Sequence, residues 1–170
     1  SLLITSVGFS QTIPVTFDSD IISGAKSNTG VTPADANWFS DSGLASVSVE
    51  DLASDTPDKG KAGKIVSSQD GQTYQNAQLL LNNNYIDLTT NKTITLDVYS
   101  DNAQDFLLKI EEGLNTTVVT EKGFSHSGSG WETIAVDFSI SERDKPVPND
   151  QYRKLVIFPG WNVAAAGWNP

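Results

Sequence analysis

Two neighbouring stretches of the sequence decide the fold: Thr93–Ser100 reads TITLDVYS and Phe106–Glu112 reads FLLKIEE. In the first stretch, Ile94, Leu96 and Val98 alternate with polar or amphipathic residues. Successive side chains of a β-strand point to opposite faces, so this period of two predicts a strand with one buried face and one solvated face. The second stretch alternates in the same way. The pair therefore predicts two successive strands, each with one buried face and one solvated face.

The same alternation recurs along the chain and predicts an all-β fold. Short runs of β-branched and aromatic residues end in clusters of Gly, Asn, Asp, Ser or Pro, as strands do, and helical periodicity is nearly absent. Further strands are expected at Ile13–Asp18, Ala45–Glu50, Lys61–Ser67, Gln75–Leu81, Thr116–Lys122, Glu132–Ile140 and Arg153–Pro159. Short, regularly spaced strands of this kind are typical of an antiparallel β-sandwich.

Length and spacing predict one domain. At 170 residues, the chain has the size of a single β-sandwich. Residues 1–12 are expected to be a linker or a leading edge segment, and residues 13–170 to form the domain. The polar segments Ser19–Gly43 and Asp51–Gly60 are too long for hairpin turns and are interpreted as loops.

Composition excludes several classes of function. The chain has 11 basic and 21 acidic residues and a formal net charge of −10, which repels the phosphates of nucleic acid. No apolar run approaches the length of a membrane span, so no membrane insertion by this segment is expected. The absence of Cys excludes disulfides and thiolate chemistry, and it leaves oxygen ligands for any metal. No Gly-rich phosphate loop occurs, so no organic cofactor is expected.

Catalytic patterns are weak, and the chain is predicted not to be an enzyme. His126, the one histidine, lies in a Ser/Gly-rich segment and is expected to be a solvent-exposed loop residue with no nucleophile elbow nearby. Glycosidases need two carboxyl groups that flank the scissile bond. The neighbouring acids have opposite strand parity, so they cannot converge on one substrate. These acids are Glu111 with Glu112, Glu50 with Asp51, and Glu132 with Asp137.

Aromatic and amide side chains lie at places where a core does not require them. In Glu132–Ile140, parity puts Ile134 and Ile140 in the core and directs Trp131 away from it. Exposed rings stack on the C–H faces of sugars, and amides and carboxylates bind sugar hydroxyls. The candidate rings are Trp38, Tyr74, Trp131, Trp161 and Trp168, and the candidate hydroxyl ligands are Asn76, Gln78 and Asp97. The alternative is that the tryptophans plug the ends of the sandwich.

Several segments together resemble a known family. They are Val15–Asp18, Lys64–Val66, Gly71–Tyr74, Ile94–Ser100, Leu107–Glu111, Gly130–Thr133, Val136–Ser139 and Tyr152–Pro159. In order and pattern, this set resembles the jelly-roll carbohydrate-binding modules of marine Bacteroidetes, of the kind attached to laminarinases or carried by surface glycan-binding proteins. Relatives tend to have Trp where this chain has Tyr74. The resemblance extends over nearly the whole chain from Ile13 onward.

The resemblance implies a jelly-roll topology and non-catalytic binding of a polysaccharide, with β-1,3-glucan (laminarin) as the leading ligand. It also implies an extracellular or outer cell-surface location, other domains in a longer parent chain, and a structural Ca²⁺ ion bound by Asp18, since carboxylate oxygens suit that ion. Two alternatives stay open. One is a glycoside hydrolase that acts on β-glucan, and the other is a structural or adhesion sandwich domain.

Overall fold

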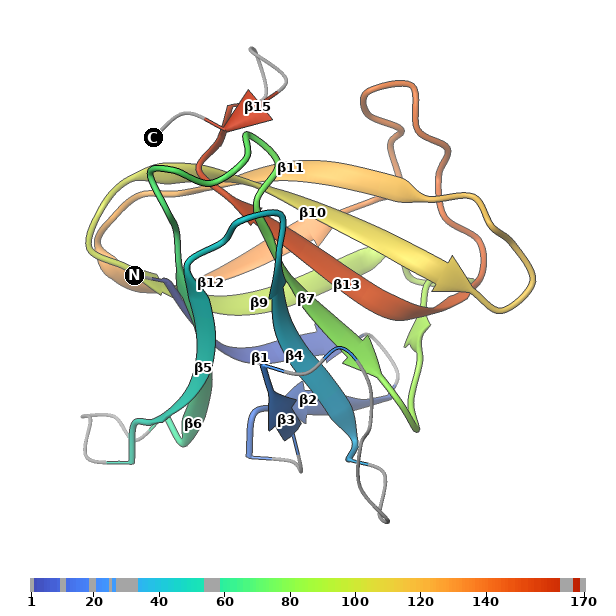
Figure 1. Ribbon diagram of the computed structural model, residues 1–170. Helices are drawn as coiled ribbons and strands as arrows, with labels where there is room; N and C mark the ends of the chain where they lie inside the picture. Colours follow the sequence, from blue (N-terminus) through green and yellow to red (C-terminus); the bar gives the residue numbers. More distant parts are fainter. Residues whose placement is uncertain are drawn as a thin grey trace.

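The computed structural model describes residues 2–9, 12–18, 21–24, 26, 34–53, 59–162 and 167–168. These residues form two β-sheets that pack face to face, and a short two-stranded pair, as Figure 1 shows. The predicted β-sandwich is confirmed for this part of the chain. Among the residues described, no helix is long and apolar enough to cross a membrane.

The first sheet has six strands in the order β12-β9-β1-β6-β5, with β2 paired to β1. The strands are β1 (Leu2–Phe9), β2 (Thr12–Thr16), β5 (Ser46–Asp51), β6 (Lys61–Val66), β9 (Thr93–Ser100) and β12 (Gly130–Asp137). Their pairings are antiparallel. Residues 1–12, expected to be a linker or a leading edge segment, contain β1, which lies between β9 and β6. The start of the chain therefore contributes an inner strand of the sandwich.

The second sheet has seven strands in the order β11-β10-β13-β7-β4-β3, with β8 paired to β13. The strands are β3 (Ile21–Ser23), β4 (Ala36–Asp41), β7 (Asn76–Leu81), β8 (Ile86–Asp87), β10 (Gln104–Gly113), β11 (Thr120–His126) and β13 (Gln151–Pro159). Only the β3–β4 pairing is parallel among the described pairs of this sheet. A hairpin of β14 (Trp161–Asn162) and β15 (Gly167–Trp168) follows β13.

The two deciding stretches form β9 and β10, and their apolar faces meet in the core. Ile94, Leu96 and Val98 of β9 are buried, as predicted. Phe106 and Ile110 of β10 are buried in the same cluster, and Phe106 stacks on Phe124 of β11 at 4.9 Å between ring centroids. Burial of apolar surface between the sheets is the main stabilising contribution to such a fold.

Trp38 does not lie on the surface, and its assignment to a loop and to a sugar-stacking platform was wrong. The segment Ser19–Gly43 contains β3 and β4, and Trp38 of β4 is 0% exposed. Its ring packs edge-on against Phe17 at 5.4 Å, and its Nε1 donates a hydrogen bond to the Ser48 carbonyl oxygen at 3.2 Å. Because β4 is buried on both faces, its sequence shows no alternation from which the strand could be predicted.

Two strand boundaries also differ from the prediction for local reasons. β11 begins at Thr120 rather than Thr116, because the Thr116 hydroxyl accepts a hydrogen bond from the Val118 amide and forms a turn there. β12 ends at Asp137, whose carboxylate accepts a hydrogen bond from the Ser139 amide. Ile140, expected in the core, consequently lies beyond the strand and is 69% exposed. The jelly-roll topology stays a prediction.

Candidate functional site

The seven-stranded sheet carries a row of polar side chains on the face that points away from the core. Ala77 and Leu79 of β7 face the core, so Asn76 and Gln78 point outward. The strand register continues this outward row across the sheet. Gln78 pairs with Val156 of β13, and Val156 pairs with Lys109 of β10. We call these outward polar residues the outer polar face: Asp41, Asn76, Gln78, Lys109, Glu111 and Lys154.

Amide groups form one half of the outer polar face. The Gln78 Nε2 atom donates hydrogen bonds to Asn76 Oδ1 at 2.8 Å and to Asp41 Oδ2 at 3.3 Å. The Asn76 Nδ2 atom donates to the Tyr74 carbonyl oxygen at 2.9 Å. Asn76 and Gln78 are largely buried, whereas Tyr74 is 53% exposed. These contacts hold the planar amide groups in fixed orientations and tie them to the backbone of Tyr74, whose side chain is exposed.

Asp41 is the carboxylate of this half. Burial alone would raise its pKa, but hydrogen bonds from the Ser42 amide and Lys26, with the positive charges of Lys26 and Lys154, hold the pKa below its ordinary value. The Lys26 Nζ atom lies 3.3 Å from Asp41 Oδ2. Asp41 is therefore ionised at neutral pH and offers an acceptor for hydroxyl groups. The positive charge of Lys154 makes the smallest of these contributions.

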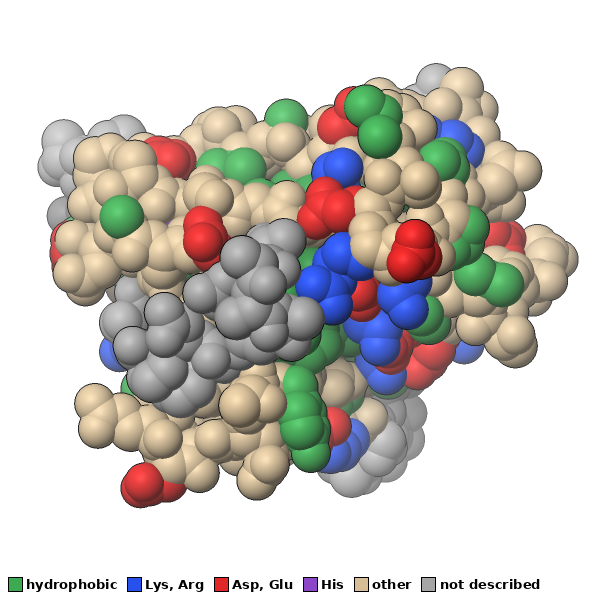
Figure 2. All heavy atoms as spheres, turned by 90° about the horizontal axis from the view of Figure 1, so that it is seen from above, with side chains coloured by type: hydrophobic (Ala, Val, Ile, Leu, Met, Phe, Trp, Pro, Cys, Tyr) green, Lys and Arg blue, Asp and Glu red, His purple; other side chains and the backbone are tan. Residues whose placement is uncertain are grey.

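Charged groups form the other half. Glu111 bridges two lysines, with Lys109 Nζ at 2.6 Å from Oε1 and Lys154 Nζ at 2.9 Å from Oε2. Lys154 also lies 3.4 Å from Glu112. Figure 2 shows Lys and Arg side chains gathered in one place with Asp and Glu side chains beside them. This half combines ammonium donors and carboxylate acceptors.

The ion pairs of Glu111 predict a loss of stability in acid. Burial would raise the pKa of Glu111, but the hydrogen bonds and charges of Lys109 and Lys154 outweigh it and lower the pKa. A carboxylate with a lowered pKa stabilises the fold above its unfolded pKa, and this contribution disappears as the pH falls through the folded value. We expect Glu111→Gln to cost about 0.5–1 kcal/mol at pH 7 and much less at pH 3.

Urea denaturation of the unaltered protein and of the Glu111→Gln variant, each at pH 7 and at pH 3, measures this effect. The matched control is Glu112→Gln, which removes a more exposed carboxylate that contacts only one of these lysines. An equal destabilisation of the Glu111 variant at both pH values would show that the ion pairs do not stabilise the fold.

Trp161 and Trp168 belong to the short strands β14 and β15, which come after β13 in the sequence. The Trp161 ring packs edge-on against Phe158 at 5.4 Å, and the Arg143 guanidinium carbon lies 5.3 Å from its centroid. Trp161 is only 8% exposed, so the prediction that it forms an open stacking platform was wrong. The ring instead covers an apolar residue on the outer face of β13. The backbone of Trp168 pairs with Trp161, and its side chain lies outside the described residues.

Trp131 and Asp97 lie on the opposite side of the sandwich. They belong to β12 and β9, on the face of the six-stranded sheet that points away from the core. The structure thus brings Asn76 and Gln78 together on one sheet, with Tyr74 in the turn before β7, and it separates them from Trp131 and Asp97. Sequence reasoning missed Lys109, Glu111 and Lys154, although the alternation of FLLKIEE already places Lys109 and Glu111 on one outward face.

His126 was wrongly expected to be exposed. It is only 2% exposed at the end of β11. Its Nδ1 atom accepts a hydrogen bond from the Gly128 amide at 2.9 Å, so Nε2 carries the proton and donates to the Val98 carbonyl oxygen at 3.2 Å. Nδ1 also lies 3.5 Å from a Glu132 carboxylate oxygen. The histidine therefore fixes the turn between β11 and β12 against β9.

Asp18 lies in the turn after β2. Its Oδ1 atom accepts a hydrogen bond from the Lys61 amide at 3.0 Å, and its carboxylate lies so close to Gly60 that an added Cβ would be 2.8 Å from Oδ2. In the described part of the chain, no group of three His, Asp or Glu side chains could hold a metal ion. The contacts of Asp18 with β6 explain its position, and the Ca²⁺ site stays a prediction.

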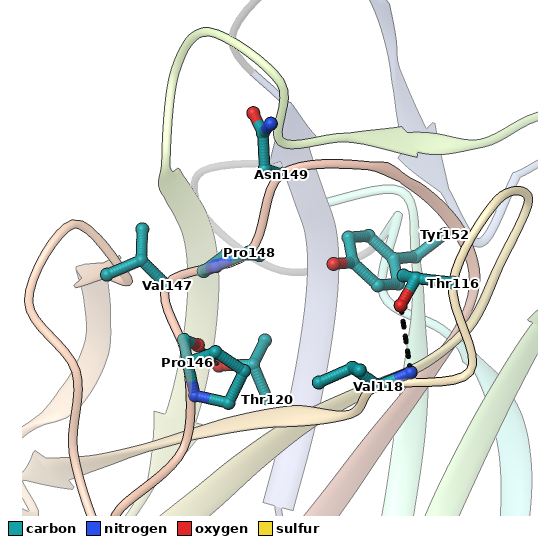
Figure 3. A pocket seen from close by; sticks show the side chains of 8 residues that line it. All are labelled: Thr116, Val118, Thr120, Pro146, Val147, Pro148, Asn149 and Tyr152. Carbon is teal, nitrogen blue, oxygen red and sulfur yellow. Dashed lines mark hydrogen bonds between the residues drawn. The ribbon is translucent and has the colours of Figure 1, made fainter.

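A pocket of about 220 Å³ lies where the β10–β11 loop meets the segment before β13 (Figure 3). Its polar groups already bond within the protein: the Thr120 hydroxyl donates to the Pro146 carbonyl oxygen, and the Thr116 hydroxyl accepts from the Val118 amide. None of the predicted site residues lines it. The lining residues are Thr116, Val118, Thr120, Pro146, Val147, Pro148, Asn149 and Tyr152.

Comparison with known proteins adds no relative. A scan against models of protein families finds no match to this chain, and neither does a search of curated proteins.

Proposed function

We propose that the chain is a non-catalytic carbohydrate-binding module that takes a β-glucan, with β-1,3-glucan (laminarin) as its leading ligand, on the outer polar face. The observation that supports this most is the ordered polar row of Asp41, Gln78 and Asn76, which bonds to the backbone of Tyr74, a residue with an exposed ring. A sugar ring needs an aromatic surface for its C–H face and fixed acceptors and donors for its hydroxyls. Tyr74 supplies the first, and Asp41 and the lysines supply the second, while the largely buried Gln78 donates to Asp41 and orients it.

The ionisation of the carboxyl groups supports binding without hydrolysis. A glycosidase needs one carboxyl group that stays protonated to donate to the leaving oxygen, which requires a raised pKa. In the described part of the chain, the pKa lies below its ordinary value at seven acids: Asp41, Glu50, Asp87, Glu111, Glu132, Asp137 and Asp150. These groups are suited to accept hydrogen bonds from hydroxyls rather than to act as general acids.

The proposed ligand also implies where the module acts and which partners it has. A polysaccharide is met outside the cell, so we place the module in the extracellular space or on the outer cell surface, attached to other domains of a longer parent chain. The strongly acidic composition disfavours nucleic acid as a partner. A purely structural or adhesion role would leave the ordered amide row beside Tyr74 without a ligand.

Tyr74→Ala tests the proposed site. The ring is exposed and makes no core contact in the described part of the chain, so we expect laminarin affinity to fall by about 10-fold, or about 1.4 kcal/mol, with stability nearly unchanged. Tyr74→Phe keeps the ring and should retain most of the affinity. Isothermal titration calorimetry measures both values.

Tyr85→Ala is the matched control, because Tyr85 is another exposed tyrosine in the loop before β8. Its loss should leave laminarin affinity unchanged. Equal affinities of the Tyr74→Ala variant and the unaltered protein would exclude the outer polar face as the site.

A structural Ca²⁺ ion bound by Asp18 is proposed separately, on the chemistry of its carboxylate. If Asp18 binds this ion, EDTA should lower the melting temperature while laminarin affinity at low temperature persists. Asp18→Asn should then abolish the effect of EDTA. Identical melting curves with and without EDTA would remove the ion from the account.

A further inference from the structure

A second aromatic surface lies on the outer face of the six-stranded sheet. Trp131 of β12 pairs with Tyr99 of β9, and their rings meet edge-on at 5.5 Å. In the next row, Thr133 pairs with Asp97, and the Thr133 hydroxyl donates to Asp97 Oδ1 at 2.6 Å. Thr133 is exposed, and the other three residues are partly exposed. Two rings and a hydroxyl–carboxylate pair therefore form one continuous patch, which we call the β9–β12 patch.

The charges around the β9–β12 patch select the kind of ligand that it can take. Asp97 lies within it, and Asp101 accepts a hydrogen bond from the Tyr99 hydroxyl at 2.6 Å. These carboxylates disfavour anions such as uronates or phosphates. The Lys59 Nζ atom lies over the Trp131 ring, 4.9 Å from its centroid, so a sugar that stacks on this face of the indole must displace the Lys59 side chain. A neutral, hydroxyl-rich ring fits both the aromatic and the acceptor groups.

We propose that the β9–β12 patch is a second carbohydrate-binding surface, which takes a neutral sugar ring against Trp131 with its hydroxyls directed to Asp97 and Thr133. The choice of a glucan as its ligand rests on the proposed function. The strand register fixes the geometry of the patch. Trp131 and Thr133 lie on the same face of β12, directly opposite Tyr99 and Asp97 of β9. No movement of the backbone is needed to present these groups.

The two surfaces belong to different sheets and point away from the same core. A short oligosaccharide therefore cannot contact both, and each chain should bind two short ligands. A long glucan could be held at two points or joined to a second glucan chain, which raises the apparent affinity for polymer above that for oligomer.

Calorimetry with a β-1,3-linked glucose hexasaccharide tests this inference. We expect two ligands per chain for the unaltered protein. In Trp131→Ala and in Tyr74→Ala, the altered site should weaken by about 10-fold or more, so that one unaltered site remains. The site that each variant retains should keep its affinity within about 2-fold. Trp131→Phe, which keeps a ring, should retain two sites. Ala135→Ser, on the same face of β12 but away from Trp131, is the matched control and should change nothing.

Each other outcome counts against the inference in a different way. One ligand per chain, lost in Tyr74→Ala and unaffected in Trp131→Ala, would leave the proposed function intact and overturn the second surface. One ligand that only Trp131→Ala abolishes would overturn both the second surface and the outer polar face as the primary site. Absence of any binding would contradict the proposed function itself. Sedimentation that shows a dimer broken by Trp131→Ala would identify the patch as a self-association surface instead.

Discussion

Trp38→Ala is expected to lower the free energy of unfolding by about 3–5 kcal/mol, because a fully buried indole leaves a large cavity when it is truncated. The ring is surrounded by the core of the sandwich and packs edge-on against Phe17. The Ser48 carbonyl oxygen would also lose the hydrogen bond that it accepts from Nε1. Urea denaturation followed by circular dichroism measures the loss. Laminarin affinity of the remaining folded protein should be unchanged.

Two controls separate burial from surface function. Trp38→Phe keeps part of the apolar volume and should cost less than the alanine variant. Tyr74→Ala removes an exposed ring and should change stability by no more than about 0.5 kcal/mol. If the Trp38→Ala protein had full stability and weakened laminarin binding, Trp38 would be a surface residue that contacts sugar, as the sequence interpretation proposed.

Trp161→Ala is expected to cost about 3 kcal/mol of stability. The ring covers Phe158 and lies against the Arg143 guanidinium group, so its truncation exposes an apolar side chain on the outer face of β13. The cost should be below that of Trp38→Ala, because Trp161 lies outside the main core cluster. Thermal and urea denaturation measure the change.

Arg143→Ala is the control for Trp161, because it removes the cation over the ring and keeps the indole. Arg143 also pairs with Glu121 at 2.8 Å, so its loss should cost about 1 kcal/mol. A stable Trp161→Ala protein that binds laminarin about 10-fold more weakly would instead show that the ring contacts sugar.

Much of the fold could be predicted because alternation is a property of strands with one solvated face. β9 and β10 were predicted from it, and their inward sets are buried as predicted, although Leu107 on the outward face of β10 is buried as well. β4 could not be predicted in this way, because both of its faces are covered and its residues include Asn37 and Ser40. β1 was assigned to a leading segment, yet it pairs with both β6 and β9. Its place depends on partners far along the chain.

The candidate site was predicted less completely for a related reason. Residue type suggested which side chains suit a sugar, and Tyr74 and Trp131 are indeed accessible at the surface. Exposure, however, is decided by segments distant in sequence. Phe17 lies against Trp38, and β9 and the β11–β12 turn enclose His126. These contacts join residues far apart in the sequence, so a local sequence pattern does not predict them.

The most direct test of the central claim is a calorimetric titration of the unaltered protein with laminarin, with an assay for reducing ends on the same samples. We predict saturable binding of laminarin, much weaker binding of cellulose, and no release of reducing ends over hours of incubation. Release of reducing ends would identify a glycoside hydrolase, and the absence of any heat of binding would leave only a structural or adhesion role. Either result would contradict the assignment as a carbohydrate-binding module.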